Sequence, residues 1–233
     1  MNGNKTIGKR LEALFDLITL AHKKQPYDAI WDCCCDHGYL GLKILSQELC
    51  PTLYFVDQVP HIMQQLMVDL SHYPSDRYQT ITADAGTLSL PINQRHLMIL
   101  AGVGGERIIE IINNLNTHNK SQQIDYLLCP TTAQFDLREY LITTDFKLTY
   151  EAIVSEKGRD YEILLISHSL TAQNRADITL TGQMWEANNP NHQRYRQKLI
   201  KHYQKQTQGE RNKAQRAEKI LEHYQLLPAD RAH

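Results

Sequence analysis

The stretch AIWDCCCDHGYLG, residues 29–41, decides the fold of this chain. A short apolar run enters it, and Leu40, Leu42, Ile44 and Leu45 follow with the spacing of an amphipathic helix. A strand, a tight turn and a helix are therefore expected in that order. In an open parallel sheet such a junction lies at the carboxyl end of a strand, where backbone N–H groups at the helix start face a ligand crevice.

The composition fits one globular domain of ordinary size with an appendage. The chain has 233 residues, of which 42% are hydrophobic, enough for a sizeable core. It has no run of 18 apolar residues, and its N-terminus is polar. We therefore expect a cytoplasmic protein with no membrane association. Five cysteines suit a reducing compartment, and their spacing matches no zinc motif, so no metal is expected. Cys33, Cys34 and Cys35 fill space or serve redox chemistry, and the sequence leaves that choice open.

Apolar periodicity predicts alternating strands and helices over most of the chain. Buried strands are predicted after Pro26 and at 53–57, 78–83, 97–101 and 126–130. Helices are predicted at 7–24, 40–48, 60–70, 105–115 and 137–142. Two further runs, 148–154 and 161–167, are separated only by a turn-like segment. The alternation predicts an α/β fold with a doubly wound, mostly parallel sheet that ends in an antiparallel hairpin.

The last part of the chain is helical and basic. From Asn191 onward apolar residues recur with helical spacing, interrupted by Gly209, in a stripe too narrow for an independent core. We therefore divide the chain into a body, 1–170, and a C-terminal helical domain, 171–233, a hairpin or short coiled coil that leans on the body. Residues 184–233 carry 10 basic and 5 acidic side chains, against 15 and 21 in the rest. The tail either binds a polyanion or is a solvated helical surface.

Three predicted strands end in a carboxylate, and the ends of such strands meet at one crevice of a doubly wound sheet. Asp32 and nearby Asp36 follow the first strand, Asp57 ends the second, and Asp84 follows the third. A carboxylate after the second strand can accept hydrogen bonds from both hydroxyls of a ribose, and one after the third can accept from an adenine amine. An adenosyl group with a free ribose is therefore the predicted occupant.

The turn after the first strand separates two classes of cofactor. A dinucleotide site needs the glycines of a G-x-G-x-x-G turn, but residues 33–38 read CCCDHG. Two acids beside a pyrophosphate would also repel it. A cationic ligand fits better, and S-adenosylmethionine (SAM) carries both a sulfonium and an ammonium. Alternatively, Asp32 and Asp36 only cap the following helix.

Four blocks of the sequence form a recognisable set. The first is Asp32, a turn of small residues, and then Asp36-His37-Gly38-Tyr39-Leu40. The second is the apolar run Ile99-Leu100-Ala101 into Gly102-Val103-Gly104-Gly105. The later blocks are Leu137-Arg138, and Glu151 and Glu156 with Tyr161-Glu162-Ile163. In order and spacing the chain resembles the bacterial tRNA (adenine-22 N1)-methyltransferase family, from Lys9-Arg10-Leu11 through the hairpin and more loosely into the tail.

The resemblance implies a Rossmann-like enzyme with a C-terminal helical appendage that transfers a methyl group from SAM to N1 of a tRNA adenine. Orientation and desolvation then carry the catalysis, because the N1 lone pair is already nucleophilic. Asp36 or His37 would accept a proton, and Gly102 and Gly104 would leave room for a base. The candidate cofactor-binding residues are Asp32, Cys34, Asp36, His37, Gly38, Asp57, Gln58, Asp84, Ala85, Ala101 and Gly102. The candidate RNA-binding residues are Arg107, Arg194, Arg196, Lys198, Lys201 and Lys205.

The chain departs from the family pattern beside the expected methyl group. Cys34 stands in place of a glycine, Asp57 in place of a glutamate, and Cys129-Pro130-Thr131 in place of Gln-Pro-Asn. Two alternatives therefore stay open. One is a SAM-dependent methyltransferase for another RNA site or a small molecule, and the other is a catalytically reduced Rossmann-like RNA-binding protein. We expect a monomer or a weak dimer with tRNA as its partner.

Overall fold

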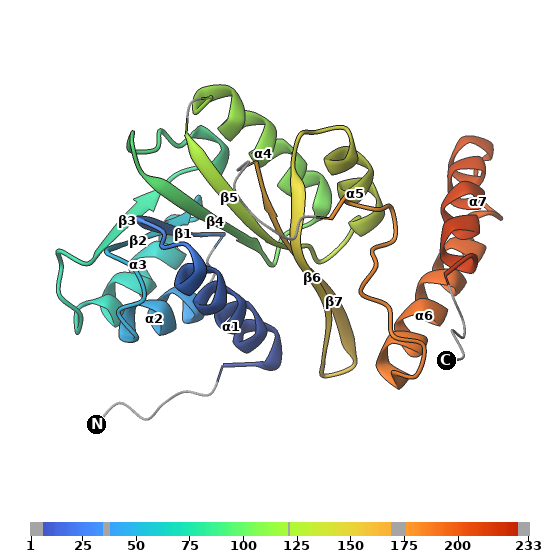
Figure 1. Cartoon of the computed structure of the whole chain (residues 1–233), viewed down its shortest axis with the longest axis horizontal. Coiled ribbons are helices and arrows are strands. Elements are labelled where there is room, and N and C mark those ends of the chain that lie inside the picture. Colours follow the sequence, from blue (N-terminus) through green and yellow to red (C-terminus); the bar gives the residue numbers. More distant parts are fainter. Residues whose placement is uncertain (1–6, 35–37, 121, 169–175, 228–233) are drawn as a thin grey trace.

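The computed structural model describes residues 7–34, 38–120, 122–168 and 176–227 of the chain. Within them a seven-stranded sheet lies between helices, and a helical pair follows it (Figure 1). The strands are β1 (Ala29–Cys33), β2 (Thr52–Asp57), β3 (Tyr78–Thr82), β4 (Arg95–Ala101), β5 (Gln123–Cys129), β6 (Lys147–Glu156) and β7 (Arg159–Ser167). The helices are α1 (Lys9–Lys24), α2 (Tyr39–Ser46), α3 (Pro60–Leu70), η1 (Ala85–Thr87), α4 (Gly105–His118), α5 (Gln134–Ile142), α6 (Pro190–Gln206) and α7 (Arg211–Gln225). None of the helices in this described part is long and apolar enough to cross a membrane.

The sheet has the doubly wound arrangement that the sequence predicts. Its strands lie in the order β3-β2-β1-β4-β5-β7-β6, and β1 to β5 are parallel to one another. β7 runs antiparallel to both β5 and β6, so the predicted terminal hairpin forms one edge. The order reverses between β1 and β4, and such a switch point is where open α/β sheets bind ligands. The predicted Rossmann-like fold is confirmed.

Most element boundaries differ from the sequence prediction by one to three residues, and two of them show why. β4 begins at Arg95, two residues early, because its polar start is paired. The Arg95 N–H donates to Asp28 at 2.7 Å, and the guanidinium pairs with Asp125. α2 ends at Ser46 instead of Glu48, whose φ of 49° is incompatible with a helix. Hydrophobic periodicity identifies buried segments. It therefore does not detect the polar first residues of a strand or a residue with a positive φ that ends a helix.

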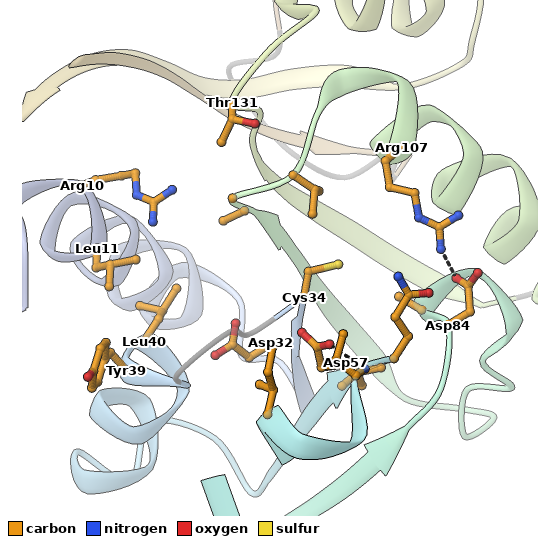
Figure 2. A pocket seen from close by; sticks show the side chains of 18 of the residues that line it. Arg10, Leu11, Asp32, Cys34, Tyr39, Leu40, Asp57, Asp84, Arg107 and Thr131 are labelled. Atoms are coloured by element: carbon orange, nitrogen blue, oxygen red, sulfur yellow. Dashed lines mark hydrogen bonds and ion pairs between the residues drawn. The ribbon is translucent and has the colours of Figure 1, made fainter. Parts of the chain in front are cut away.

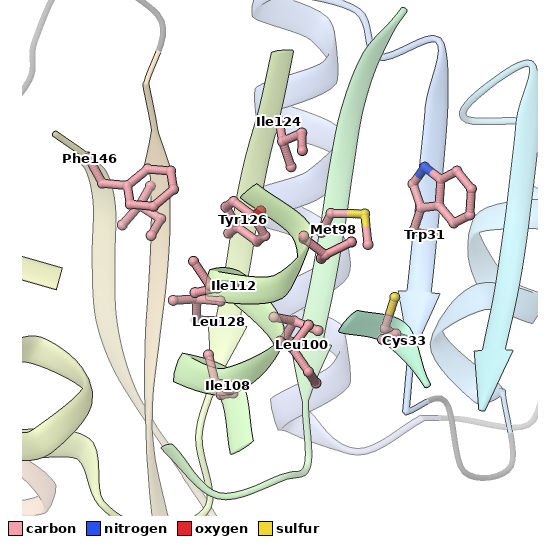
Figure 3. Close-up of a cluster of buried hydrophobic side chains, with 14 of the residues drawn as sticks. Trp31, Cys33, Met98, Leu100, Ile108, Ile112, Ile124, Tyr126, Leu128 and Phe146 are labelled. Atoms are coloured by element: carbon pink, nitrogen blue, oxygen red, sulfur yellow. The ribbon is translucent and has the colours of Figure 1, made fainter. Parts of the chain in front are cut away.

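Alternation along the strands gives the sheet two apolar faces. One face packs on α4 and α5, with Trp31, Met98 and Leu100 among its strand residues (Figure 3). The other packs on α1, α2 and α3, with Ile30 and Phe55 among its strand residues. Burial on both faces explains why the strands read as continuous apolar runs. The helix layers leave the strand ends as the place where a ligand can enter.

Helices α6 and α7 form the predicted helical hairpin and lean on α5 of the body (Figure 1). Their shared core contains Tyr203, Ile220 and Tyr224, and Phe135 of α5 completes it. Arg216 of α7 adds ion pairs to two carboxylates of α5. The division between residues 170 and 171 lies outside the described residues, so the domain boundary stays a prediction.

Candidate active site

A cavity of about 640 Å³ opens at the carboxyl ends of the parallel strands, beside the switch point (Figure 2). Small-molecule sites have roughly this size, about 300–1,000 Å³. Most of the candidate cofactor-binding residues line it: Asp32, Cys34, Asp57, Gln58, Asp84, Ala85, Ala101 and Gly102. Of the other described candidates, Gly38 and Gly104 do not line it, and Asp36 and His37 lie outside the described residues. The structure therefore brings the predicted strand-end acids together.

Asp32 joins the cavity to the start of α2. Its side chain is buried, and its Oδ2 accepts the N–H of Gly41 at 2.9 Å. A glycine is required there, because a Cβ at Gly41 would lie 2.8 Å from this oxygen and would overlap the Phe55 ring. Gly38 precedes the helix with a φ of 65°, which glycine adopts without strain. Helix capping, the alternative for Asp32, is thus one of its roles, while the same residue also lines the cavity.

Burial raises the pKa of Asp32 to about 7. The N–H of Gly41 opposes this rise, and the charge of neighbouring Asp57 adds to it. An ionised Asp32 is therefore costly in the unliganded protein, and a cation beside it would recover that cost. The electrostatics of the cavity favour a ligand that carries positive charge near the end of β1.

Asp57 ends β2, the strand next to β1, and faces the same cavity (Figure 2). Its Oδ1 accepts the N–H of Val59 at 2.9 Å, which fixes the side chain in a local turn. Among the described residues its second oxygen has no hydrogen-bond donor, so that oxygen can accept from a ligand. A carboxylate held in this way suits the hydroxyls of a ribose, as the sequence predicts.

Asp84 and Arg107 form an ion pair at the β3 end of the cavity (Figure 2). Arg107 Nη2 lies 2.5 Å from Asp84 Oδ1, which also accepts the N–H of Gly86 at 2.8 Å. The hydrogen bond from Arg107 lowers the pKa of Asp84. The same guanidinium lies 2.5 Å from Glu110. Arg107 thus takes part in the cavity wall, and its contact with RNA stays a prediction.

The glycines after β4 have two different roles. Gly102 lines the cavity with a φ of 91°, a conformation that favours glycine. Gly104 and Gly105 let the start of α4 pack on the turn after β5. A Cβ on Gly104 would lie 2.8 Å from Thr132 Oγ1, and one on Gly105 would overlap the carbonyl of Ala133. The structure thus places Gly104, predicted to leave room for a base, in a packing contact away from the cavity lining.

Cys34 occupies a backbone position that favours glycine. Its φ of 58° lies in the left-handed region, and its N–H donates to the carbonyl of Val56 at 2.8 Å. A residue with a Cβ costs roughly 1–2 kcal/mol in this conformation, which explains the glycine of the family motif. Burial raises the pKa of the Cys34 thiol to about 11, so the thiol is neutral and unreactive at ordinary pH. This environment favours space filling over redox chemistry.

Several residues that line the cavity do not lie at the ends of the first three strands, so the sequence does not predict them as strand-end residues. Arg10 and Leu11 belong to α1, Arg159 and Tyr161 to β7, and Thr131 to the turn after β5. α1 precedes the first strand of the sheet and β7 is the last strand along the chain, so no spacing in the sequence brings them together. The one available signal is that Arg10, Leu11 and Tyr161 belong to the blocks that resemble the family.

The basic candidates of the tail divide into two groups. Arg194 pairs with Asp160 of β7. Arg196 donates to the carbonyls of Tyr224 and Gln225 at 3.1 and 2.9 Å, which ties α6 to the end of α7. The second group is Lys198, Lys201 and Lys205, which are exposed on α6, as Arg194 also is. RNA binding by all five residues stays a prediction.

A second cavity of about 500 Å³ lies between the turn after β5 and the α6–α7 hairpin. Thr132, His202 and Lys213 are among the residues that line it. Thr131, the neighbour of Thr132, lines the first cavity, so this turn contributes one residue to each cavity.

A doubly wound sheet with acids at three neighbouring strand ends and a cavity at its switch point is typical of α/β proteins that bind nucleosides. The family follows from the sequence. A family model described as a methyltransferase domain matches residues 7–164, more than half of the chain. The chain belongs to this methyltransferase domain family.

Three known proteins illustrate the likeness. TrmK of M. capricolum, solved in complex with its natural cofactor product S-adenosyl-homocysteine, has a TM-score of 0.74 at 17% identity and covers 95% of this chain and 99% of its own. The m1A22 tRNA methyltransferase TrmK of B. subtilis has a TM-score of 0.67 at 16% identity and covers 95% and 97%. A Mycoplasma pneumoniae protein, named as a candidate tRNA methyltransferase, is 26% identical over 161 residues, 68% of this chain and 70% of its own. At these identities the structural matches establish the shared fold.

Proposed function

We propose that the chain is a SAM-dependent methyltransferase that modifies N1 of an adenine in tRNA. The observation that carries the proposal is a row of acids along one cavity, in the strand order Asp84, Asp57, Asp32. SAM presents its groups in a matching order, with the adenine first, then the ribose, then the cationic sulfonium and ammonium. A dinucleotide would instead bring a pyrophosphate against the buried carboxyl group of Asp32.

The surroundings of each acid suit one group of the cofactor. The free oxygen of Asp57 can accept from the ribose hydroxyls, and Asp84 lies where an adenine amine can donate. Asp32, costly when ionised alone, gains most from a positive charge. SAH in complex with the M. capricolum relative supports the same class of cofactor. The residues present therefore fit SAM.

In methyl transfer to a ring nitrogen, protein side chains take little part in the bond-forming step. SAM supplies the methyl group when it is bound, and the N1 lone pair of adenine is the nucleophile. The chain binds both groups in line and excludes water between them. Gly102 has no side chain on the β4 side of the cavity, which leaves space for a flat base. Asp36 and His37 remain the candidates for taking up a proton.

The tRNA substrate is supported by relatives and by the tail. The B. subtilis relative is a tRNA methyltransferase that acts at adenine 22, and the M. pneumoniae relative is a candidate tRNA methyltransferase. In this chain Lys198, Lys201 and Lys205 are exposed and spaced three and four residues apart, so they share one face of α6. A stripe of this kind suits the phosphate backbone of RNA. The second cavity lies between this tail and the turn after β5, and Thr131 of that turn lines the first cavity.

Deleting the gene is expected to remove 1-methyladenosine from the tRNA that this enzyme modifies. The measurement is mass spectrometry of nucleosides from purified tRNA of the parent and the deletion strain. A wild-type copy should restore the modification. A copy with Asp57→Asn should restore much less, because it lacks the charged acceptor for the ribose.

The other outcomes of this comparison separate the alternatives. Loss of a different methylated nucleoside would identify a methyltransferase for another RNA site. Unchanged methylation in the deletion strain would contradict the proposal. If the purified chain then bound tRNA but not SAM, it would be an RNA-binding protein without transfer activity.

A further inference from the structure

The guanidinium of Arg10 is a cation in the cavity that the proposed function leaves without a role. Figure 2 shows it pointing from α1 toward the cavity. A Cβ at Gly102 would lie 3.8 Å from Arg10 Nη1, and the guanidinium lies 5.0 Å from the centre of the Tyr161 ring. Burial raises the pKa of the Cys129 thiol to about 12, and nearby Arg10 opposes that rise. The guanidinium thus sits where β4, β5 and β7 meet.

Arg10 is held in place from two sides. Its backbone N–H donates to Glu156 Oε2 at 3.3 Å, and Gly8 packs so closely on this carboxylate that a Cβ there would overlap it. A carboxylate at the first turn also complements the dipole of α1. The Tyr161 ring supports the guanidinium at a cation–π distance. The backbone of Arg10 is thus fixed by β6, and its guanidinium lies against β7.

The other two arginines of the cavity are placed differently. Arg107 is taken up by Asp84 and Glu110 at the β3 end. Arg159 is exposed at the start of β7. Arg10 is therefore the best-placed described cation for a ligand group that lies near the end of β4.

Strand order places the Arg10 guanidinium beyond Asp32 along the cavity. The sheet runs β3, β2, β1, β4, so the wall passes Asp84, Asp57 and Asp32 and then reaches Gly102, where the guanidinium lies. A ligand whose adenosine lies beside Asp84 and Asp57 has its far end between the buried carboxyl group of Asp32 and the guanidinium of Arg10. The far end of SAM is an amino acid, with one ammonium and one carboxylate. Near three acids that carboxylate needs a cationic partner.

We propose that Arg10 binds the carboxylate of the cofactor's methionine end while Asp32 faces its ammonium. This assignment rests on the proposed function, since it takes SAM as the ligand. The planar fork of arginine matches a carboxylate with two parallel hydrogen bonds. Arg10 is then a specificity residue, because it selects adenosyl ligands that keep the carboxylate over those that have lost it.

Calorimetric titration of the full chain with two ligands tests the assignment. SAM and its decarboxylated form, S-adenosylmethioninamine, differ only in the carboxylate. The wild type is expected to bind SAM about 30-fold more tightly than the decarboxylated ligand. Arg10→Met should weaken SAM binding about 30-fold and change binding of the decarboxylated ligand less than about twofold. Arg10→Lys, which keeps the charge but loses the fork, should fall between these limits.

Lys9→Met is the matched control, because it removes the same charge from the neighbouring exposed position of α1. It should leave both affinities within about twofold of wild type. Equal weakening of both ligands by Arg10→Met would overturn the assignment. So would an unchanged SAM affinity with a higher half-saturating tRNA concentration, which would assign the guanidinium to RNA. A wild-type chain that bound neither SAM nor S-adenosyl-homocysteine would instead reject the proposed function itself.

Discussion

Replacing Asp32 by asparagine is expected to weaken SAM binding about 100-fold and to stabilise the unliganded protein at pH 8. Both effects come from one buried carboxyl group. Removing a desolvated charge from a charge pair costs roughly 2–5 kcal/mol of binding free energy. Asparagine still has an oxygen to accept the N–H of Gly41, so the turn before α2 should survive. The variant therefore separates the charge of Asp32 from its hydrogen bond.

The pH dependence has opposite signs for stability and for binding. An unfolded aspartate titrates near pH 4, whereas burial raises the pKa of Asp32 in the folded protein to about 7. Between these values the folded state binds more protons, so the stability of the unliganded protein falls as the pH rises from about 4 to 7. Above about pH 7 the penalty is constant, on the order of 4 kcal/mol. SAM affinity should fall about tenfold per pH unit below pH 7, because the ligand's cation needs the ionised carboxylate.

Thermal melting and calorimetry measure the two effects. Asp32→Asn should gain about 2 kcal/mol at pH 8, less than the full penalty because the amide must also be desolvated. The gain should disappear near pH 5, where the wild-type carboxyl is already protonated. Asp69→Asn, an exposed change on α3, is the control for net charge. If Asp32→Asn bound SAM as tightly as wild type, Asp32 would only cap the helix.

Replacing Arg138 by methionine is expected to lower the free energy of unfolding by about 4 kcal/mol. Arg138 of α5 is fully buried, with Nε 2.8 Å from Glu162 Oε2 and Nη2 2.8 Å from Glu151 Oε2. Removing the guanidinium leaves two buried carboxylates without a counter-charge. Urea denaturation measures the loss, which should also lower the melting temperature by about 10 °C.

The same change should loosen the tail. Arg138 Nη1 donates to the carbonyl of Thr179 at 3.3 Å, and Tyr195 of α6 donates its hydroxyl to Glu162 at 3.1 Å. The cluster thus joins α5 and β7 to the start of the helical hairpin. Limited proteolysis should therefore cut Arg138→Met between β7 and α6 faster than it cuts the wild type.

A triple variant shows whether charge causes the loss. R138M/E151Q/E162Q removes all three charges but keeps oxygens that accept from Tyr195 and from the N–H of Gln183. It should recover most of the stability lost in the single variant, since a neutral core of similar shape tolerates such a replacement. A triple variant as unstable as Arg138→Met would assign the loss to packing. A single variant as stable as wild type would contradict the role of the cluster.

The acids of the site could be predicted because their signals are local. Asp57 ends a short apolar run and Asp84 follows another, and parallel topology turns such positions into neighbours. The turn after β1 was equally informative, since its acids exclude a pyrophosphate. The buried strands follow from continuous apolar runs and the helices from a period of 3.6 residues, which are also local patterns.

Contacts between distant segments could not be predicted in the same way. Arg10 meets Tyr161 only after α1 and β7 have packed on the same sheet, and no spacing in the chain records this. Arg138 looks like an ordinary helix residue until the hairpin buries it against Glu162. Gly104 is a related case, because the sequence alone does not show that this glycine packs against Thr132.

Methyl transfer by the purified chain tests the central claim most directly. The chain is incubated with SAM and an unmodified tRNA transcript, and the digested nucleosides are analysed by mass spectrometry. We expect 1-methyladenosine with the wild type, and none above background with Asp32→Asn at a SAM concentration that saturates only the wild type. The absence of 1-methyladenosine from a reaction in which calorimetry shows the wild type to be saturated with SAM would contradict the account.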